Sequence, residues 1–77
     1  MKTALDYRTR LMELRLDHKL TQKDVAELCG ISDATVGHWE NLKRHVSLTC
    51  LTRLCAHYGV SADYILGLPR DLDYPDR

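Results

Sequence analysis

The feature that most constrains this 77-residue chain is a four-residue pattern that occurs twice. Residues 29–32 read Cys-Gly-Ile-Ser, and residues 58–61 read Tyr-Gly-Val-Ser. In each segment the glycine suits the left-handed conformation that follows a helix, and the serine is a preferred N-cap for the next helix. We expect the β-branched residue between them to be buried. The pattern therefore predicts two tight helix-to-helix connections, and the length predicts a single domain.

Apolar residues at helical spacing predict five helices and no strand. Thr21 is a candidate N-cap with Asp24 in the capping-box position, and Gly30 ends the helix that Thr21 begins. Ser32 caps the following helix, which carries Val36 and Trp39 on one face. The helices are expected at about residues 7–17, 21–29, 32–41, 48–58 and 62–66. The predicted fold class is all-α, with one domain over residues 1–68 and a polar tail over residues 69–77.

The segment from about residue 21 to residue 41 predicts a helix-turn-helix. Two short helices joined by a three- or four-residue turn that contains glycine cross at a steep angle. Ala26 permits this crossing, because a larger side chain there would push the two helices apart. The face of the second helix opposite Val36 and Trp39 is small or polar and is able to enter a DNA major groove. This face comprises Asp33, Ala34, Gly37 and His38.

Composition and motifs argue against several classes of protein. Hydrophobic residues make up 44% of the chain and charged residues 29%, which favours a folded domain over disorder. No apolar run approaches the roughly 18 residues of a membrane span, and no secretory signal follows the first residues, so we expect a cytoplasmic protein. Phosphate loops, nucleophile elbows and His-Glu metal motifs are absent from the sequence, so we expect no enzyme.

The three cysteines are Cys29, Cys50 and Cys55, and all lie within predicted helices. Their odd number does not suit the disulfide framework of a small secreted domain, and their spacing does not suit a zinc site. We interpret the thiols as structural apolar groups and expect neither a metal nor a cofactor.

The ordered set of motifs resembles the lambda repressor and Cro-like group of helix-turn-helix proteins, also called the XRE family. The resemblance covers about residues 7–67 and rests on residues 22–26 (QKDVA), 30–32 (GIS), 36–41 (VGHWEN) and 59–66 (GVSADYIL). It implies a five-helix domain and a transcriptional regulator, most often a repressor, whose third helix reads a DNA operator. It also implies an internal ion pair between Arg15 and Glu40, for which two independent surface charges are the alternative.

The resemblance implies DNA contacts at three places. At the start of the second helix it implies that Gln22 contacts a phosphate. Thr21 and Lys23 lie beside Gln22, where the N–H groups of the helix start favour an anion. The alternative for Gln22 is an ordinary helix start exposed to solvent. Base contacts in relatives fall at and just after the Ser32 cap and one turn later, positions that here hold Asp33, Ala34, Thr35 and His38. For Asn41, Lys43 and Arg44 the resemblance implies contacts with the DNA backbone. The alternative is a basic loop that is only exposed to solvent.

Two positions depart from the family pattern. Asp33 and Ala34 stand where relatives often carry Gln, Arg or Ser. Asp33 repels phosphates. Its carboxylate either accepts a hydrogen bond from a cytosine amino group or interacts with the positive N-terminal end of its own helix, and the sequence leaves both interpretations open. Val46 stands where relatives frequently have proline, so we expect a looser turn at this position.

The net charge of the chain and the number of competing DNA sites in a genome indicate which partners to expect. The charges of the 11 basic and 11 acidic residues cancel, which weakens the case for non-specific DNA binding. The zero net charge favours an alternative function, that of a protein-interaction module or antitoxin-like regulator. Its partner would then be a toxin or a co-regulator. One recognition helix reads too few base pairs to be specific alone, so we expect a homodimer on a near-palindromic operator. The expected dimer face holds Tyr64, Leu66, Leu68 and Leu72, although a core position for Leu66 is equally open.

Overall fold

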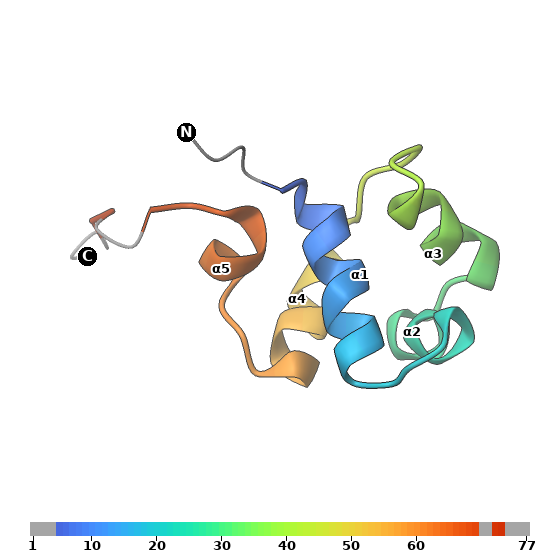
Figure 1. Ribbon diagram of the computed structural model, residues 1–77. Helices are drawn as coiled ribbons and strands as arrows, with labels where there is room; N and C mark the ends of the chain where they lie inside the picture. The colour runs from blue at the N-terminus through green and yellow to red at the C-terminus, as the bar shows by residue number, and fades with distance from the viewer. Residues whose placement is uncertain (1–4, 70–71, 74–77) are drawn as a thin grey trace.

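The computed structural model describes residues 5–69 and 72–73, which form five helices and no strand (Figure 1). The helices are α1 (Tyr7–Asp17), α2 (Gln22–Cys29), α3 (Asp33–Glu40), α4 (Leu48–Tyr58) and α5 (Ala62–Leu66). These bounds agree with the predicted helices, and the all-α fold class is confirmed. Most of the tail predicted at 69–77 lies outside the described residues, which include only Pro69, Leu72 and Asp73 of it.

The helices are arranged on both sides of α1 (Figure 1). The α2–α3 pair lies on one side and α5 on the other; α1 packs against α3 and α5, and α4 packs against α2 and α5. This arrangement leaves α3 at one end of the molecule and α5 near the opposite end. Among the helices that the structure describes, none has the length and apolar character needed to cross a membrane.

Side-chain caps begin all five helices. The predicted capping box of α2 is present: Thr21 Oγ1 accepts from the N–H of Asp24 at 3.0 Å, and the Asp24 carboxylate accepts from the N–H of Thr21 at 2.8 Å. Ser32, Ser47 and Ser61 cap α3, α4 and α5 with a single bond each, in which the hydroxyl accepts from the backbone N–H three positions later. These bonds satisfy N–H groups that have no partner inside a helix, so local side chains determine where the helices begin.

The two copies of the repeated pattern adopt the same backbone conformation. Gly30 has φ 70° and ψ 38°, and Gly59 has φ 68° and ψ 35°. The N–H groups of Ile31 and Val60 donate to the carbonyls of Ala26 and Cys55 at 3.0 and 3.1 Å. Ile31 and Val60 are only partly buried, so our expectation of full burial was wrong. They pack against the edge of the core, because a turn residue has a neighbouring helix on one side alone.

One hydrophobic core joins all five helices. Its buried members are Leu11, Val25, Ala26, Cys29, Val36, Trp39, Val46, Cys50, Leu51, Leu54, Tyr58 and Ile65. The structural role of the cysteines is confirmed for Cys29 and Cys50, which are buried, and Cys55 packs against the core while partly exposed; all three thiols are free. Burial raises the pKa of the Cys29 thiol to about 12, so this thiol stays protonated and apolar.

Candidate nucleic-acid interface

The interface is built on the crossing of α2 and α3. Ala26 of α2 and Val36 of α3 are each 1% exposed, so both lie fully inside the core where these two helices pack together. Gly37 faces Gln22: a Cβ added at Gly37 would lie 3.7 Å from Gln22 Oε1. Because Val36 and Trp39 direct one face of α3 into the core, the opposite face is presented to solvent.

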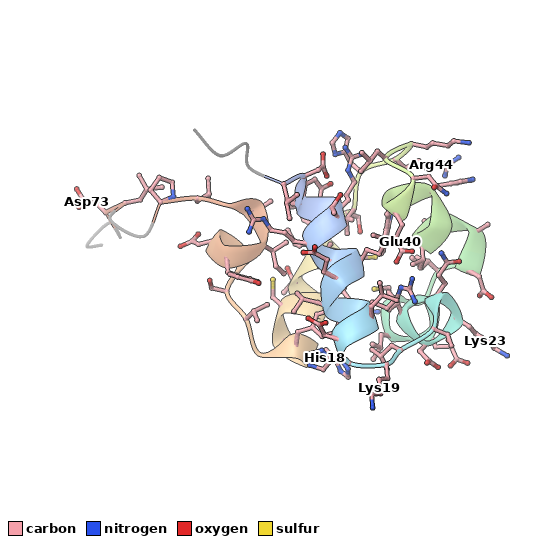
Figure 2. The ribbon with its side chains drawn as sticks, viewed as in Figure 1. His18, Lys19, Lys23, Glu40, Arg44 and Asp73 are labelled. Carbon is pink, nitrogen blue, oxygen red and sulfur yellow. The ribbon has the colours of Figure 1, made fainter. Side chains whose placement is uncertain are left out.

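The carboxylate of Glu40 ties three helices together. Arg15 donates from Nε to Glu40 Oε2 at 2.7 Å and from Nη2 to Oε1 at 3.0 Å, which confirms the expected ion pair between α1 and α3. Gln22 also donates from Nε2 to Glu40 Oε1, at 2.9 Å. The Arg15 and Glu40 side chains are only 13% and 10% exposed, so the geometry is held in a largely desolvated site. Figure 2 shows Glu40 between α1 and α3.

The predicted base-contact residues lie together at the start and along the outer face of α3. Ser32, Asp33 and Ala34 are exposed, and Thr35 and His38 are partly exposed. The hydroxyls of Ser32 and Thr35 are 2.9 Å apart and hydrogen-bonded, and Ser32 Oγ accepts from the N–H of Thr35. Both hydroxyls therefore have one structural partner and keep a free acceptor position, while the Asp33 and His38 side chains make no hydrogen bond to other described residues.

The predicted phosphate-contact residues flank α3 on both sides. Thr21 and Lys23 are exposed at the start of α2, where Figure 2 shows Lys23 directed away from the helices. Asn41, Lys43 and Arg44 are exposed in the loop after α3. The His38 carbonyl fixes that loop, since it accepts from the N–H groups of Lys43 at 2.8 Å and Arg44 at 3.3 Å.

Sequence reasoning missed the residues that anchor this loop to α1. Tyr7 Oη accepts from the N–H of Val46 at 2.9 Å and shares a second hydrogen bond, also of 2.9 Å, with His45 Nδ1. Our expectation that Val46 loosens the turn was wrong: Val46 is buried, and its N–H makes a hydrogen bond that proline lacks the hydrogen to make. The absence of proline at this position was the one sequence feature that could have indicated a hydrogen bond from the Val46 N–H.

Arg8 makes a second connection between α1 and the loop. Arg8 Nη1 donates to the Arg44 carbonyl at 3.0 Å, while Nε and Nη2 donate to the two Asp6 carboxylate oxygens at 2.8 Å each. The hydrogen bonds from Arg8 lower the pKa of Asp6 to about 2. The start of α1 thereby holds the backbone of the loop that carries Lys43 and Arg44.

Comparison with known proteins assigns the family. A helix-turn-helix family model matches residues 11–65. The HTH-type transcriptional regulator YobD of Bacillus subtilis (strain 168) is 43% identical over 67 residues, which are 87% of this chain; the chain spans 60% of the length of that relative.

Solved structures agree with this assignment. The P22 c2 repressor, determined with a synthetic operator, superposes with a TM-score of 0.74 at 22% identity, over 82% of this chain and 96% of that protein. The restriction-modification controller protein C.AhdI of Aeromonas hydrophila gives 0.67 at 30% identity, over 77% and 89%. The chain belongs to the helix-turn-helix family of the lambda repressor and XRE type, a family of DNA-binding transcription regulators rather than enzymes.

Proposed function

We propose that this protein is a cytoplasmic, operator-specific transcriptional repressor that inserts α3 into the DNA major groove. The observation that carries the proposal is the exposed face of α3, fixed from behind by the Arg15–Glu40–Gln22 network. A rigidly held helix with an uncommitted polar face is what base readout requires. The similarity to C.AhdI and to YobD supports a regulator of transcription, and the operator in the P22 c2 repressor structure supports DNA as the ligand.

The roles divide between specificity and general affinity. His38 and the segment 33–35 lie on the exposed face of α3 and read base edges. Lys23, Lys43 and Arg44 flank α3 and bind phosphates, together with Asn41, Thr21 and the backbone N–H groups at the start of α2. Gln22 Nε2 carries two hydrogens, of which the bond to Glu40 uses one, so the second is available to a phosphate.

The functional unit is a homodimer. Two-fold pairing repeats the readout about 34–36 Å away, which gives a site long enough to be specific. Tyr64, Leu66, Leu68 and Leu72 are between 42% and 59% exposed, and this excludes the core position considered for Leu66. Tyr64 and Leu66 belong to α5, with Leu68 and Leu72 in the segment that follows, and α5 lies on the opposite side of α1 from α3, so a dimer formed there leaves both recognition helices free (Figure 1).

Salt dependence tests whether DNA is the ligand. The binding of duplex DNA is measured by fluorescence anisotropy at several salt concentrations for the wild type, Lys43→Gln and Arg53→Gln. Phosphate contacts release counterions, so the affinity should fall steeply with salt, and Lys43→Gln should reduce the slope by about one. Arg53 is exposed on α4, with its guanidinium beside Gly30, and is not among the predicted contact residues, so Arg53→Gln serves as the matched control and should leave the slope unchanged. Weak, salt-independent binding would favour a protein-interaction module instead.

A further inference from the structure

Leu42, in the loop after α3, has a backbone conformation that leucine rarely adopts. Its φ of 61° lies in the left-handed region, where a Cβ approaches the carbonyl oxygen that follows it. The left-handed positions after α2, α4 and α5 hold Gly30, Gly59 and Gly67, which lack a Cβ and do not incur this cost. Glycine at position 42 would therefore make the folded state more stable than leucine does.

The rest of the fold does not require leucine at this position. The N–H of Leu42 donates to the Trp39 carbonyl at 3.0 Å, and glycine would make the same bond. The Leu42 side chain is 49% exposed, and in the described part of the chain it belongs neither to the hydrophobic core nor to the side chains packed against it. A single exposed leucine is ordinary, but one held in a costly backbone conformation points to a use in binding.

Leu42 lies among the residues proposed to bind the DNA backbone. Asn41 precedes it, Lys43 and Arg44 follow it, and all four are exposed. Figure 2 shows Arg44 of this loop beside α3. Because consecutive Cα atoms are about 3.8 Å apart, a side chain at position 42 lies close to any phosphate that its neighbours bind. The deoxyribose rings between successive phosphates are the apolar part of the DNA backbone, so they are the surface that an exposed leucine here would meet.

The loop holds Leu42 in a fixed position before any ligand binds. The His38 carbonyl accepts from the N–H groups of Lys43 and Arg44, and Arg8 of α1 donates to the Arg44 carbonyl. A side chain on a backbone that is already ordered loses little conformational entropy on binding. Ordering of the loop therefore subtracts little from the affinity that an apolar contact contributes.

We propose that Leu42 contacts DNA directly and packs its side chain on a deoxyribose ring beside the phosphates bound by Lys43 and Arg44. The proposal rests on the proposed function, to whose polar contacts it adds an apolar one. Burial of apolar surface releases no counterion, so this contact contributes equally at all salt concentrations, unlike a contact with phosphate. Leucine at this position thus lowers the stability of the fold and raises its affinity for DNA.

Three substitutions separate the side chain from the backbone conformation. Leu42→Met keeps a large apolar side chain, Leu42→Ala keeps only the Cβ, and Leu42→Gly keeps neither. Fluorescence anisotropy measures binding to a duplex that the wild type selects from a random pool, at several salt concentrations. Leu42→Met should bind like the wild type, whereas Leu42→Ala and Leu42→Gly should bind about three- to tenfold more weakly at every salt concentration, with an unchanged salt slope. Thermal unfolding should show Leu42→Gly more stable, with a midpoint about 4 °C higher, and the other two unchanged.

Three controls match these measurements. Leu16 is 54% exposed on α1 and is not among the predicted contact residues, so Leu16→Ala should leave the affinity for DNA unchanged. Lys19 has φ 57° in the turn after α1, which Figure 2 shows on the other side of the molecule from Arg44. Lys19→Gly should therefore raise the unfolding midpoint as Leu42→Gly does. Replacing thymidine by deoxyuridine in the duplex should leave the ratio of wild-type to Leu42→Ala affinity unchanged, because only the thymine methyl is lost and the sugar is kept.

The contact would be overturned if Leu42→Ala bound DNA as tightly as the wild type. A Leu42→Gly variant that lost stability together with affinity would also overturn it, since leucine would then have a structural role. A loss of affinity confined to thymine-containing DNA would do the same, since the contact would then be with a base. Wild-type binding that does not fall with salt would instead refute the proposed function, so the wild type alone distinguishes that failure from the failure of the Leu42 contact.

Discussion

Gln22 of α2 and Glu40 of α3 are joined by a hydrogen bond of 2.9 Å, although they are 18 positions apart in the sequence. The same Glu40 oxygen accepts from Arg15 of α1. The residue expected to contact a phosphate is thus oriented by the ion pair that anchors the recognition helix. The proposed phosphate contact at the start of α2 and the proposed base readout by α3 are therefore linked through a single carboxylate.

Glu40→Gln should destabilise the fold and weaken binding to all DNA sequences alike. The change leaves Arg15 charged in a largely desolvated site without its counter-ion, and breaking such a pair costs about 3 kcal/mol. Denaturant unfolding measures the loss, and anisotropy measures the affinity for several duplexes. Glu13→Gln, on the exposed surface of α1, is the control and should change the free energy of unfolding by less than about 0.5 kcal/mol. A stability equal to the wild type would show that the network is dispensable.

His38→Ala should change which sequences are bound more than how tightly DNA is bound overall. His38 lies on the outer face of α3, one turn beyond the first contact positions, so its loss should cost about 1–3 kcal/mol at one base pair and little elsewhere. Competition between operators that differ at single base pairs measures this preference. Lys43→Gln is the contrasting variant, expected to weaken all sequences together. If His38→Ala also weakened every sequence equally, the division of roles would be wrong.

Trp39→Ala should leave little folded protein at room temperature. The side chain is 4% exposed in the core beside α1 and α4, and truncation of a buried large side chain costs about 3–5 kcal/mol. Thermal unfolding followed by circular dichroism measures the loss. The native protein should also show a blue-shifted Trp emission that resists quenching. A red-shifted, freely quenched emission would place the indole in water.

Val46→Pro should destabilise the protein through its contact with Tyr7. Proline lacks the N–H that donates to Tyr7 Oη, and a net hydrogen bond contributes about 0.5–1.5 kcal/mol. In a Tyr7→Phe background the acceptor is already absent, so the same substitution should cost less. A double-mutant cycle by denaturant unfolding measures this difference. If Val46→Pro lowered the free energy of unfolding equally in both backgrounds, the hydrogen bond to Tyr7 would not be the cause.

Asp6→Asn should reduce stability at neutral pH and have a smaller effect in acid. The hydrogen bonds from Arg8 lower the pKa of Asp6 from 3.8 to about 2, so folding favours the charged form. That contribution is present above pH 3.8 and is lost as the pH falls towards about 2. Unfolding of both proteins at several pH values should therefore show a difference that shrinks over this range. A difference independent of pH would exclude the ion pair as its cause.

Local sequence signals predicted the fold well because helix boundaries depend on neighbouring residues. Thr21 with Asp24 and Gly30 begin and end α2 where expected, since caps and left-handed turns involve contacts only a few positions apart. The contacts of Tyr7 with Val46 and of Gln22 with Glu40 could not be read in this way. They span 39 and 18 positions and exist only once α1, α2 and the loop after α3 are packed together.

The candidate site residues likewise divide into those that local sequence predicted and those that required the structure. The helical period alone places His38 on the face opposite Val36 and Trp39, so its exposure was predictable. The burial of Arg10 Nε without a hydrogen-bond partner among the described residues was not predictable, because it depends on how α1 packs beside the end of α5 rather than on any motif. The exposure of Leu66 also required the structure, since helical spacing alone allowed a core position.

Selection of bound sequences from a random pool of duplex DNA tests the central claim most directly. Under the proposed function the protein reads DNA through α3 and binds as a two-fold dimer, so the enriched sequences should share a near-palindromic motif with half-sites one helical turn apart. Selection with His38→Ala should return the same motif with one position in each half-site relaxed. A pool that shows no enrichment after repeated rounds, or a motif that His38→Ala leaves unchanged, would contradict base reading by this helix.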